Sequence, residues 1–447
     1  MSATRQAETS VSPLRAPILF ALVALLFVLE GTVSNAMFSG SWNTSLTILN
    51  MGLVSAVAAL GVNMIWGYGG LFNAGVVGFI ALGGLAPVLI STQPVAGVWA
   101  AGGPRLILAL AMGLATLALA VTVAARLRGT ARIWLVAAVV ILGYIATRVA
   151  FDPAIAAIEA NNPSKAGNIG GLGLPVLLSW PVGMAFAAAA AWGVGRVALG
   201  LRSDYLAIAT LGIGEIIVAV LKNEGWLARG VLNITGIPRP VPYELQLQSN
   251  PDFVAAAARW GMDAATASGI YVKLCYASIF IAVLLTLILL AQLALYSPWG
   301  RMMHAIRDNE TAAGAMGKNV TRRHLQLFVL GSAVIGLSGA MMVTLDGLMA
   351  PGGYNPLRYT FLIWVMVIVG GSGNNWGAVL GAVLIWFLWV KAEVWGPALM
   401  SLLTSPLPPG TLVRHLTENA PHMRFIAMGL VLLAVLRFAP RGLLPER

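Results

Sequence analysis

The stretch YSPWGRMMHAIRDNETAAGAMGKNVTRRHLQLF, residues 296–328, is a polar and basic interruption between two long apolar runs. We expect its middle to form one short helix. Asp308 or Asn309 can cap the start of this helix, because a short side-chain oxygen accepts hydrogen bonds from the free backbone N–H groups there. Glu310 then lies in the first turn, where the helix dipole favours a negative charge. Gly317 is a suitable stop, because glycine readily adopts the left-handed conformation.

A short helix of small residues, exposed between two membrane spans, can lie in a groove on another protein. An ordinary basic loop is the alternative interpretation, because capping signals of this kind are common. Both interpretations place the stretch on the cytoplasmic side, since cytoplasmic loops are rich in Lys and Arg. The basic residues of this stretch are Arg301, Arg307, Lys318, Arg322 and Arg323.

The composition of the whole chain indicates an integral membrane protein. The chain has 447 residues, of which 59% are hydrophobic and only 10% are charged. A soluble globular protein carries about 25% charged residues. Many apolar runs approach the ~20 residues that a helix needs to cross the hydrocarbon core, whereas the alternating pattern of outer-membrane barrels is absent. We therefore predict an all-α, polytopic membrane bundle of about ten or eleven spans.

The charged and metal-binding side chains exclude several functions. The net charge is +11, but the Lys and Arg residues sit in short loops between apolar runs, so they indicate membrane orientation rather than nucleic-acid binding. The single cysteine, Cys275, lies in an apolar run and cannot form an intrachain disulfide. The four histidines have no metal-ligand spacing; they are His304, His324, His415 and His422.

The apolar runs divide the chain into a tail and one transmembrane domain. Residues 1–16 are expected to be a cytoplasmic tail, residues 17–447 the transmembrane domain, and residues 297–323 a cytoplasmic loop. Polar segments at 151–178, 222–271 and 393–421 are expected outside, with both termini inside. The last two apolar segments before 393 are short and flank a Gly/Asn turn. Full spans are expected at about 17–38, 46–66, 105–125, 132–150, 180–199, 271–296, 324–345 and 423–438.

The segment GYGGLFNAGVVGFIALGG, residues 67–84, is too rich in glycine for an ordinary lipid-facing helix. Glycine lowers helix propensity but lets neighbouring helices approach closely. One interpretation is therefore tight helix packing. The other is a broken helix beside a pathway, because irregular backbone is tolerated in a membrane only where it faces protein or water.

The run LRSDYLAIATLGIGEI, residues 201–216, places a carboxylate inside an apolar segment. Asp204 is expected to cap a new helix. Glu215 is costly in a membrane and is expected to face the interior of the bundle. It either makes a structural hydrogen bond near a helix end, with Lys222 as a candidate partner, or lines a pathway. The polar segment that follows, 222–271, is long enough to be functional, with an amphipathic helix near 252–260.

The stretch 296–328 resembles the E-A-A loop of ABC importer permeases, whose pattern E-A-A-x-x-x-G docks on the ATPase subunit. Thr311-Ala312-Ala313 and Gly317 fill this pattern, with threonine in place of the glutamate. The LivM branch of the branched-chain amino acid permease family is more similar still. Its matching positions are Gly300, Arg301, Ala305, Ile306, Arg307, Glu310, Ala312, Ala313 and Gly317. The resemblance implies an ATPase-docking coupling helix that comprises Arg307, Glu310, Thr311, Ala312, Ala313, Met316 and Gly317.

Three other blocks are similar to LivM segments, in the same order. Residues 63–79 share its Asn, Gly and Tyr positions but carry Leu71, Asn73 and Val76 where the family has Gln, Ser and His, so the substrate stays open. Residues 201–216 match L-R-G-D-Y-L-A-I-x-T-L-G-x-G-E-I except that Ser203 replaces the glycine, and residues 370–382 match a Gly/Ala pattern. The candidate translocation pathway comprises Asn63, Tyr68, Asn73, Asp204, Tyr205, Thr210 and Glu215.

The resemblance implies the transmembrane permease subunit of a bacterial ABC importer with a type II-like bundle that contains short broken or kinked helices. It implies a LivH-like permease in a heterodimer, two cytoplasmic ABC ATPases and a periplasmic substrate-binding protein, in the inner membrane. The expected substrates are branched-chain or other amino acids, urea, amides or aromatic acids. The chain has no phosphate-binding Gly-Lys-Ser/Thr motif, so ATP and Mg would lie on the partner subunits and this chain would bind no cofactor.

Two other classes of protein stay open. An ion-coupled secondary transporter of small organic solutes would use intramembrane carboxylates, but paired broken helices in repeated halves are not evident. A membrane enzyme would need a clustered nucleophile, base or metal site, and none is evident in the sequence.

Overall fold

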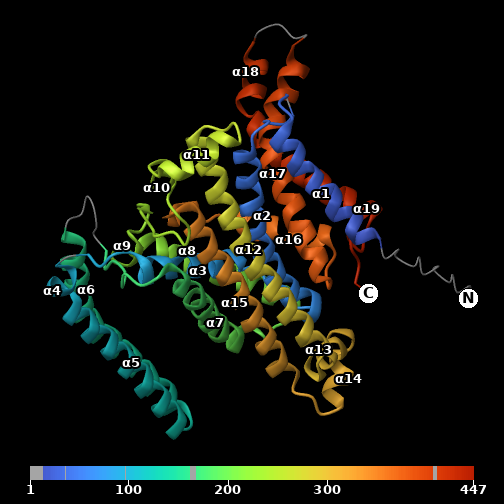
Figure 1. The fold of residues 1–447 in the computed structure, drawn as a ribbon. Helices are drawn as coiled ribbons and strands as arrows, with labels where there is room; N and C mark the ends of the chain where they lie inside the picture. Colours follow the sequence, from blue (N-terminus) through green and yellow to red (C-terminus); the bar gives the residue numbers. More distant parts are fainter. Residues whose placement is uncertain (1–13, 36, 96, 162–167, 406–409, 447) are drawn as a thin grey trace, which may run out of the picture.

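The computed structural model describes residues 14–35, 37–95, 97–161, 168–405 and 410–446. Within these residues it is a helical bundle with 10 helices long and apolar enough to cross a membrane, as Figure 1 shows. The predicted fold class is confirmed. The helices of these ten spans are α1 (Arg15–Thr32), α2 (Trp42–Gly69), α5 (Gly103–Arg126), α6 (Thr130–Ala160), α7 (Ser179–Ala198), α8 (Ser203–Asn223), α12 (Ala264–Tyr296), α15 (Val320–Asp346), α17 (Asn375–Thr404) and α19 (Met423–Phe438). The spans of α7 and α19 include the 3-10 turns that precede them, so they run over Val176–Ala198 and Ala420–Phe438.

Two shorter apolar helices complete the bundle, α3 (Val76–Ser91) and α16 (Leu362–Gly370), the second of which follows a π-helical turn at Leu357–Phe361. The predicted broken helices are confirmed by these elements. Small elements connect the spans: α4 (Val98–Ala101), α9 (Gly225–Ala228), α10 (Glu244–Gln248), α11 (Pro251–Arg259), α13 (Pro298–Asp308), α14 (Glu310–Ala315), α18 (Thr411–Glu418), and 3-10 turns at Val176–Leu178, Pro351–Gly353 and Ala420–His422.

Helix α15 lies at the centre of the bundle, between α2, α3 and α7. Glycines allow this close packing. A Cβ atom on Gly83 of α3 would overlap the backbone carbonyl of Gly336 of α15, and one on Gly61 of α2 would lie 2.7 Å from the carbonyl oxygen of Gly331. The glycine-rich segment therefore serves tight packing as well as forming a break.

Helices α5 and α6 form a hairpin at the side of the bundle (Figure 1). Its attached end buries Ala154 and Ile158 against Val98 and Leu106, whereas most of the remaining hairpin surface is exposed. The predicted loop 151–178 is wrong over its first ten residues, because α6 continues to Ala160. Asp152 did not end the helix, since it pairs with Arg148 one turn earlier, 3.0 Å away, on an exposed face.

The long polar segment between α8 and α12 is anchored to the end of α15. Strand β1 (Ile234–Thr235) pairs antiparallel with β2 (Leu348–Met349), with Ile234 opposite Met349. The predicted amphipathic helix is confirmed as α11. The boundaries 222–271 are too wide, because α8 ends at Asn223 and α12 begins at Ala264, where Asp263 caps α12 by accepting the Thr266 N–H at 2.9 Å.

Three other boundaries differ from the sequence prediction. Helix α17 continues into the expected outer loop 393–421 and ends at Thr404, with Pro397 inside it. The second of the two apolar segments that flank the Gly/Asn turn is therefore a long helix, not a short one. The loop 297–323 holds two helices rather than one, and α15 already begins at Val320. Helix α1 begins at Arg15, inside the expected tail 1–16, most of which lies outside the described residues.

Candidate functional site

The predicted docking residues lie in and beside two short helices, α13 and α14, which meet at Asn309. The Asn309 side chain accepts the backbone N–H of Ala312 at 2.9 Å, so Asn309 rather than Asp308 caps α14. Glu310 lies in the first turn, and Gly317 follows the helix with a φ of +78°. The predicted capped helix is confirmed. The sequence signal for α13, Ser297 before Pro298, was missed although it is a strong N-terminal pattern.

Ala313 is the buried residue of α14, and the other residues of this helix are exposed. Ala313 belongs to a small apolar cluster with Met303, Ile306, Leu327 and Tyr68. The exposed face carries four of the predicted docking residues and an 80% exposed methionine; they are Glu310, Thr311, Ala312, Gly317 and Met316. The segment therefore presents small and flexible side chains outward while Ala313 holds it to the bundle.

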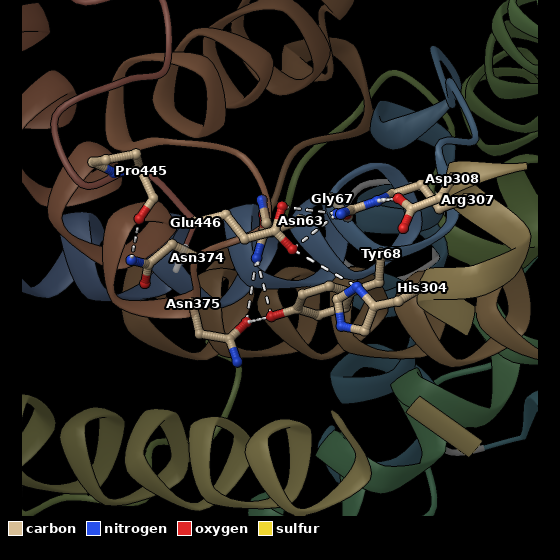
Figure 2. Close-up of polar contacts among 11 residues, drawn as sticks. Asn63, Gly67, Tyr68, His304, Arg307, Asp308, Asn374, Asn375, Pro445 and Glu446 are labelled. Atoms are coloured by element: carbon tan, nitrogen blue, oxygen red, sulfur yellow. Dashed lines mark hydrogen bonds and ion pairs between the residues drawn. The ribbon is translucent and has the colours of Figure 1, made fainter. Parts of the chain in front are cut away.

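Arg307, the seventh predicted docking residue, points into the chain rather than outward (Figure 2). Its guanidinium donates to the backbone carbonyl of Gly67, at the end of α2, and to both carboxylate oxygens of Glu446 at 3.0 Å. His304 lies on the same side, with Nδ1 3.7 Å from Glu446. Arg307 thus joins α13 to the end of α2 and to the C-terminal segment.

A buried polar cluster lies directly behind Arg307. Asn63 donates to the Asn375 side-chain oxygen at 3.2 Å and accepts the Gly373 N–H at 2.8 Å. The Tyr68 hydroxyl donates to the same Asn375 oxygen, as Figure 2 shows. A side chain at Gly67 would meet Asn63 and Gly373 at 2.6 Å. This packing connects α2 to the turn between α16 and α17.

The C-terminal segment is bound to that same turn. The Leu443 and Leu444 N–H groups donate to the carbonyls of Val369 and Gly370 at 2.8 Å. Asn374 donates to the Pro445 carbonyl at 3.2 Å. Glu446 is therefore held in place to receive Arg307.

The break between α2 and α3, residues 70–75, is buried or half-buried except at Gly70, and side chains bond several of its backbone groups. Unpaired backbone groups are costly away from water, and irregular backbone in a membrane must find protein partners. The indole N–H of Trp364 donates to the Asn73 carbonyl at 3.0 Å. Three further N–H groups are satisfied: Gly75 by Asn73 Oδ1 at 2.9 Å, Ala74 by Thr210 Oγ1 at 3.0 Å, and Val77 by Thr360 Oγ1 at 3.1 Å.

Helix α8 separates the predicted pathway residues into two groups. Thr210 is buried against the break, whereas Asp204, Tyr205 and Glu215 are exposed on this chain. Asn63, Tyr68 and Asn73 are buried with Thr210. The expected Asp204 cap is wrong: Arg202 holds the N-cap position without a side-chain bond, and Asp204 lies in the first turn. There the helix dipole already favours its charge.

A buried ion pair was missed in the sequence. Lys391 of α17 lies 2.8 Å from Glu30 of α1, and their side chains are 4% and 1% exposed. Glu30 also accepts the Ser39 N–H at 3.3 Å. The signal in the sequence was one charged residue within each of two apolar runs. The sequence does not show that these two residues pair, because Glu30 and Lys391 lie 361 residues apart.

No cluster of three or more His, Cys, Asp or Glu side chains suited to a metal ion occurs among the described residues. The described polar groups behind α14 form a connected set of hydrogen bonds. They link an exposed short helix, through Arg307, to the ends of α2 and α16.

Comparison with known proteins identifies one family. The family described as "Branched-chain amino acid transport system / permease component" matches residues 136–436, more than half of the chain. The "High-affinity branched-chain amino acid transport system permease protein LivM" of Escherichia coli is 30% identical over 214 residues, covering 46% of this chain and 48% of that protein. The protein of the same name from Salmonella typhimurium is 31% identical over 213 residues, with the same coverage.

An archaeal relative is more distant. The "Probable branched-chain amino acid transport permease protein LivM" of Methanocaldococcus jannaschii is 25% identical over 247 residues, covering 55% of this chain and 61% of that protein. The chain spans about half the length of the two bacterial relatives. No solved structure matches the chain.

Proposed function

The chain belongs to the branched-chain amino acid transport permease family, and on this premise we propose that it is the transmembrane permease subunit of an ATP-driven importer. Its substrates would be branched-chain amino acids or related small polar solutes. The observation that carries the proposal is α14, a capped helix of small residues with an exposed face. The preceding helix α13 carries Arg307, which donates to the carbonyl of Gly67 at the end of α2, just before the break.

The proposed complex supplies what this chain lacks. Two cytoplasmic ABC ATPases would bind and hydrolyse ATP with Mg, and a substrate-binding protein would deliver solute from the periplasm. A LivH-like permease would form a heterodimer with this chain. The chain itself would bind no cofactor. The free energy of ATP hydrolysis would act on it through the contact between the ATPases and the exposed face of α14.

The orientation follows from the basic loops. Arg126, Arg128 and Arg132 lie in and beside one connection between spans, and Arg437 and Arg441 lie at the end of the last span. Together with the basic segment 297–323, they favour a cytoplasmic position for these loops and for both termini. We place the protein in a bacterial inner membrane with the α10–α11 segment outside.

The mechanism we propose is alternating access. A ligand can shift a conformational equilibrium only if it binds the two states differently, so the ATPases must bind α14 differently before and after they close. A movement of α14 would pass through α13 and Arg307 to Gly67, and through Glu446 to the turn between α16 and α17. The buried Asn63, Tyr68 and Asn375 would move as one body with these ends.

The translocation pathway is proposed at the exposed face of α8. Glu215 lies roughly 18 Å along the helix from its first residue and roughly 12 Å from its last. A carboxylate at this depth is costly when it faces lipid. A partner permease that covers Asp204, Tyr205 and Glu215 would remove this cost and enclose a polar route. Asn63, Tyr68, Asn73 and Thr210 would support the wall of that route from inside this chain.

Reconstitution tests the proposal. The permease pair, reconstituted into liposomes with ATPases inside and binding protein outside, should take up solute only with internal ATP. Uptake driven by an ion gradient in liposomes without ATPases would support a secondary transporter instead. A panel of amino acids, urea, amides and aromatic acids would identify the substrate through its binding to the substrate-binding protein.

A further inference from the structure

A groove with a volume of ≈ 990 Å³ opens between α7, α13 and α15. It is separate from the exposed face of α14 and from the buried cluster behind Arg307. Its wall combines cations, indole rings and apolar side chains. The residues that matter are Trp192, Arg196, Trp299, Arg322, Arg323 and Leu330.

The three arginines of this groove lack an acidic partner within the described part of the chain. The Arg196 guanidinium stacks 4.7 Å from the ring centre of Trp192. Arg323 donates to the neutral side chain of Gln326 at 2.9 Å, and the Trp299 indole donates to the same oxygen at 3.3 Å. The groove therefore holds a concentrated positive charge that is available to an anion, and arginine is well suited to bind phosphate.

The groove changes from cationic to apolar along the helix axes. Arg322 and Arg323 lie in the first turn of α15, while Leu330 lies roughly 11 Å further along that helix. On α7, Arg196 lies near the last residue and Trp192 one turn deeper. Trp192 is 52% and Leu330 49% exposed. An occupant must therefore carry a negative charge at one end and an apolar chain at the other.

We propose that this groove binds an anionic phospholipid of the cytoplasmic leaflet. The phosphate would lie among Arg196, Arg322 and Arg323, and an acyl chain would lie along Trp192 and Leu330. Basic pockets between membrane helices on the cytoplasmic side bind anionic head groups, and tryptophan favours the level of the head groups. The proposal rests on the orientation in the proposed function. An ATPase docked beneath the membrane accounts for the arginines but not for the apolar end.

The lipid would touch the coupling machinery. Trp299 belongs to α13, the helix that carries Arg307. A bound lipid would thus pack α13 against α7 and α15 and steady the segment that receives the ATPase. Anionic lipid would then support coupling as well as binding.

Native mass spectrometry of the intact permease–ATPase complex tests the site. Phosphatidylglycerol and phosphatidylcholine with identical acyl chains are added in turn. The wild type should retain phosphatidylglycerol preferentially. Replacing Arg196, Arg322 and Arg323 together with Gln should weaken its binding at least about tenfold, since it removes the three cations that attract the anionic head group. The matched control replaces the exposed Arg126, Arg128 and Arg132 with Gln and should bind as the wild type does.

Two further arms identify the occupant. Millimolar inorganic phosphate should leave phosphatidylglycerol bound, because it lacks the acyl chain; complete displacement would identify a free-phosphate site and overturn the proposal. The triple variant should still co-purify with the ATPases. Lost co-purification with unchanged lipid preference would make the groove an ATPase contact instead.

The single substitution Arg196→Gln guards against misfolding, because Arg196 is exposed near the end of α7. It should lower the lipid preference in a complex that elutes and melts normally. Equal binding of both lipids by the wild type, or wild-type binding by both variants, would overturn the lipid site. ATP-driven uptake that persists in that case would leave the proposed function standing.

Discussion

The Arg307 guanidinium donates to the backbone carbonyl of Gly67, which lies 240 residues earlier in the chain. This contact fixes the short helices α13 and α14 to the last turn of α2, next to the break before α3. Arg307 also reaches both carboxylate oxygens of Glu446 at 3.0 Å. Through Arg307, α13 is therefore bonded to two separate parts of the bundle.

Arg307→Ala should uncouple ATP hydrolysis from uptake. A hydrogen bond to a charged group contributes about 1.5–3 kcal/mol, so we expect uptake to fall at least about tenfold while the ATPases still bind. Arg301→Ala is the matched control, because Arg301 lies on the same helix and donates only to the nearby Tyr296 carbonyl among its described hydrogen bonds. Uptake per ATP hydrolysed in proteoliposomes measures the effect, and equal coupling in both variants would contradict this route.

Ala312 and Ala313 should respond differently to substitution. Ala312→Arg enlarges the exposed face of α14, so it should reduce ATPase co-purification without lowering the melting temperature of the permease. Ala313→Asp places a carboxylate in the apolar cluster with Met303 and Ile306, where burial of an unpaired charge is costly. It should lower the melting temperature, which makes it a poor test of docking. A reversed pattern would show that α14 presents its other face.

Replacing one member of the buried pair Glu30–Lys391 should destabilise the protein strongly. Removing one partner leaves an uncompensated buried charge, which typically costs about 3–5 kcal/mol. Lys391→Met should therefore lower the unfolding temperature in detergent, and Glu30→Gln added to it should recover much of the loss. The more exposed pair Glu393–Arg424, 2.7 Å apart, serves as the control, since exposed pairs contribute about 0–1 kcal/mol. Additive losses in the Glu30–Lys391 double variant would rule out a coupled pair.

Glu215→Leu should leave the fold of this chain intact but impair the assembled transporter. Glu215 is exposed on α8 and points away from the buried Thr210 and Gly214. We expect a normal melting temperature for the isolated chain, with reduced association with the partner permease or reduced uptake. Wild-type association and uptake together would remove Glu215 from both the interface and the pathway.

The sequence predicts the spans well because their length and apolarity are local properties. It also predicts the start and stop of α14, because Asn309, Glu310 and Gly317 act within one turn of the helix. The helix ends are harder to place. Polar residues such as Asp152 can continue a helix when they lie on an exposed face, so the end of α6 was predicted too early.

The site depends on contacts that no local pattern encodes. Asn375 bonds to Asn63, which lies 312 residues earlier in the chain. Glu446 bonds to Arg307, which lies 139 residues earlier. The sequence also gives no sign of the direction in which a helix face points. For this reason Glu215 was expected inside the bundle, whereas it lies on the surface of this chain.

Cross-linking between α14 and the ATPase tests the central claim most directly. In a Cys275→Ser background, Ala312→Cys places one thiol on the exposed face of α14, and a second is placed in the groove of the partner ATPase. We predict a cross-link in the intact complex that stops uptake, with the thiol labelled only from the cytoplasmic side. Labelling from the outside, or uptake by the permease pair in liposomes without any ATPase, would contradict the account.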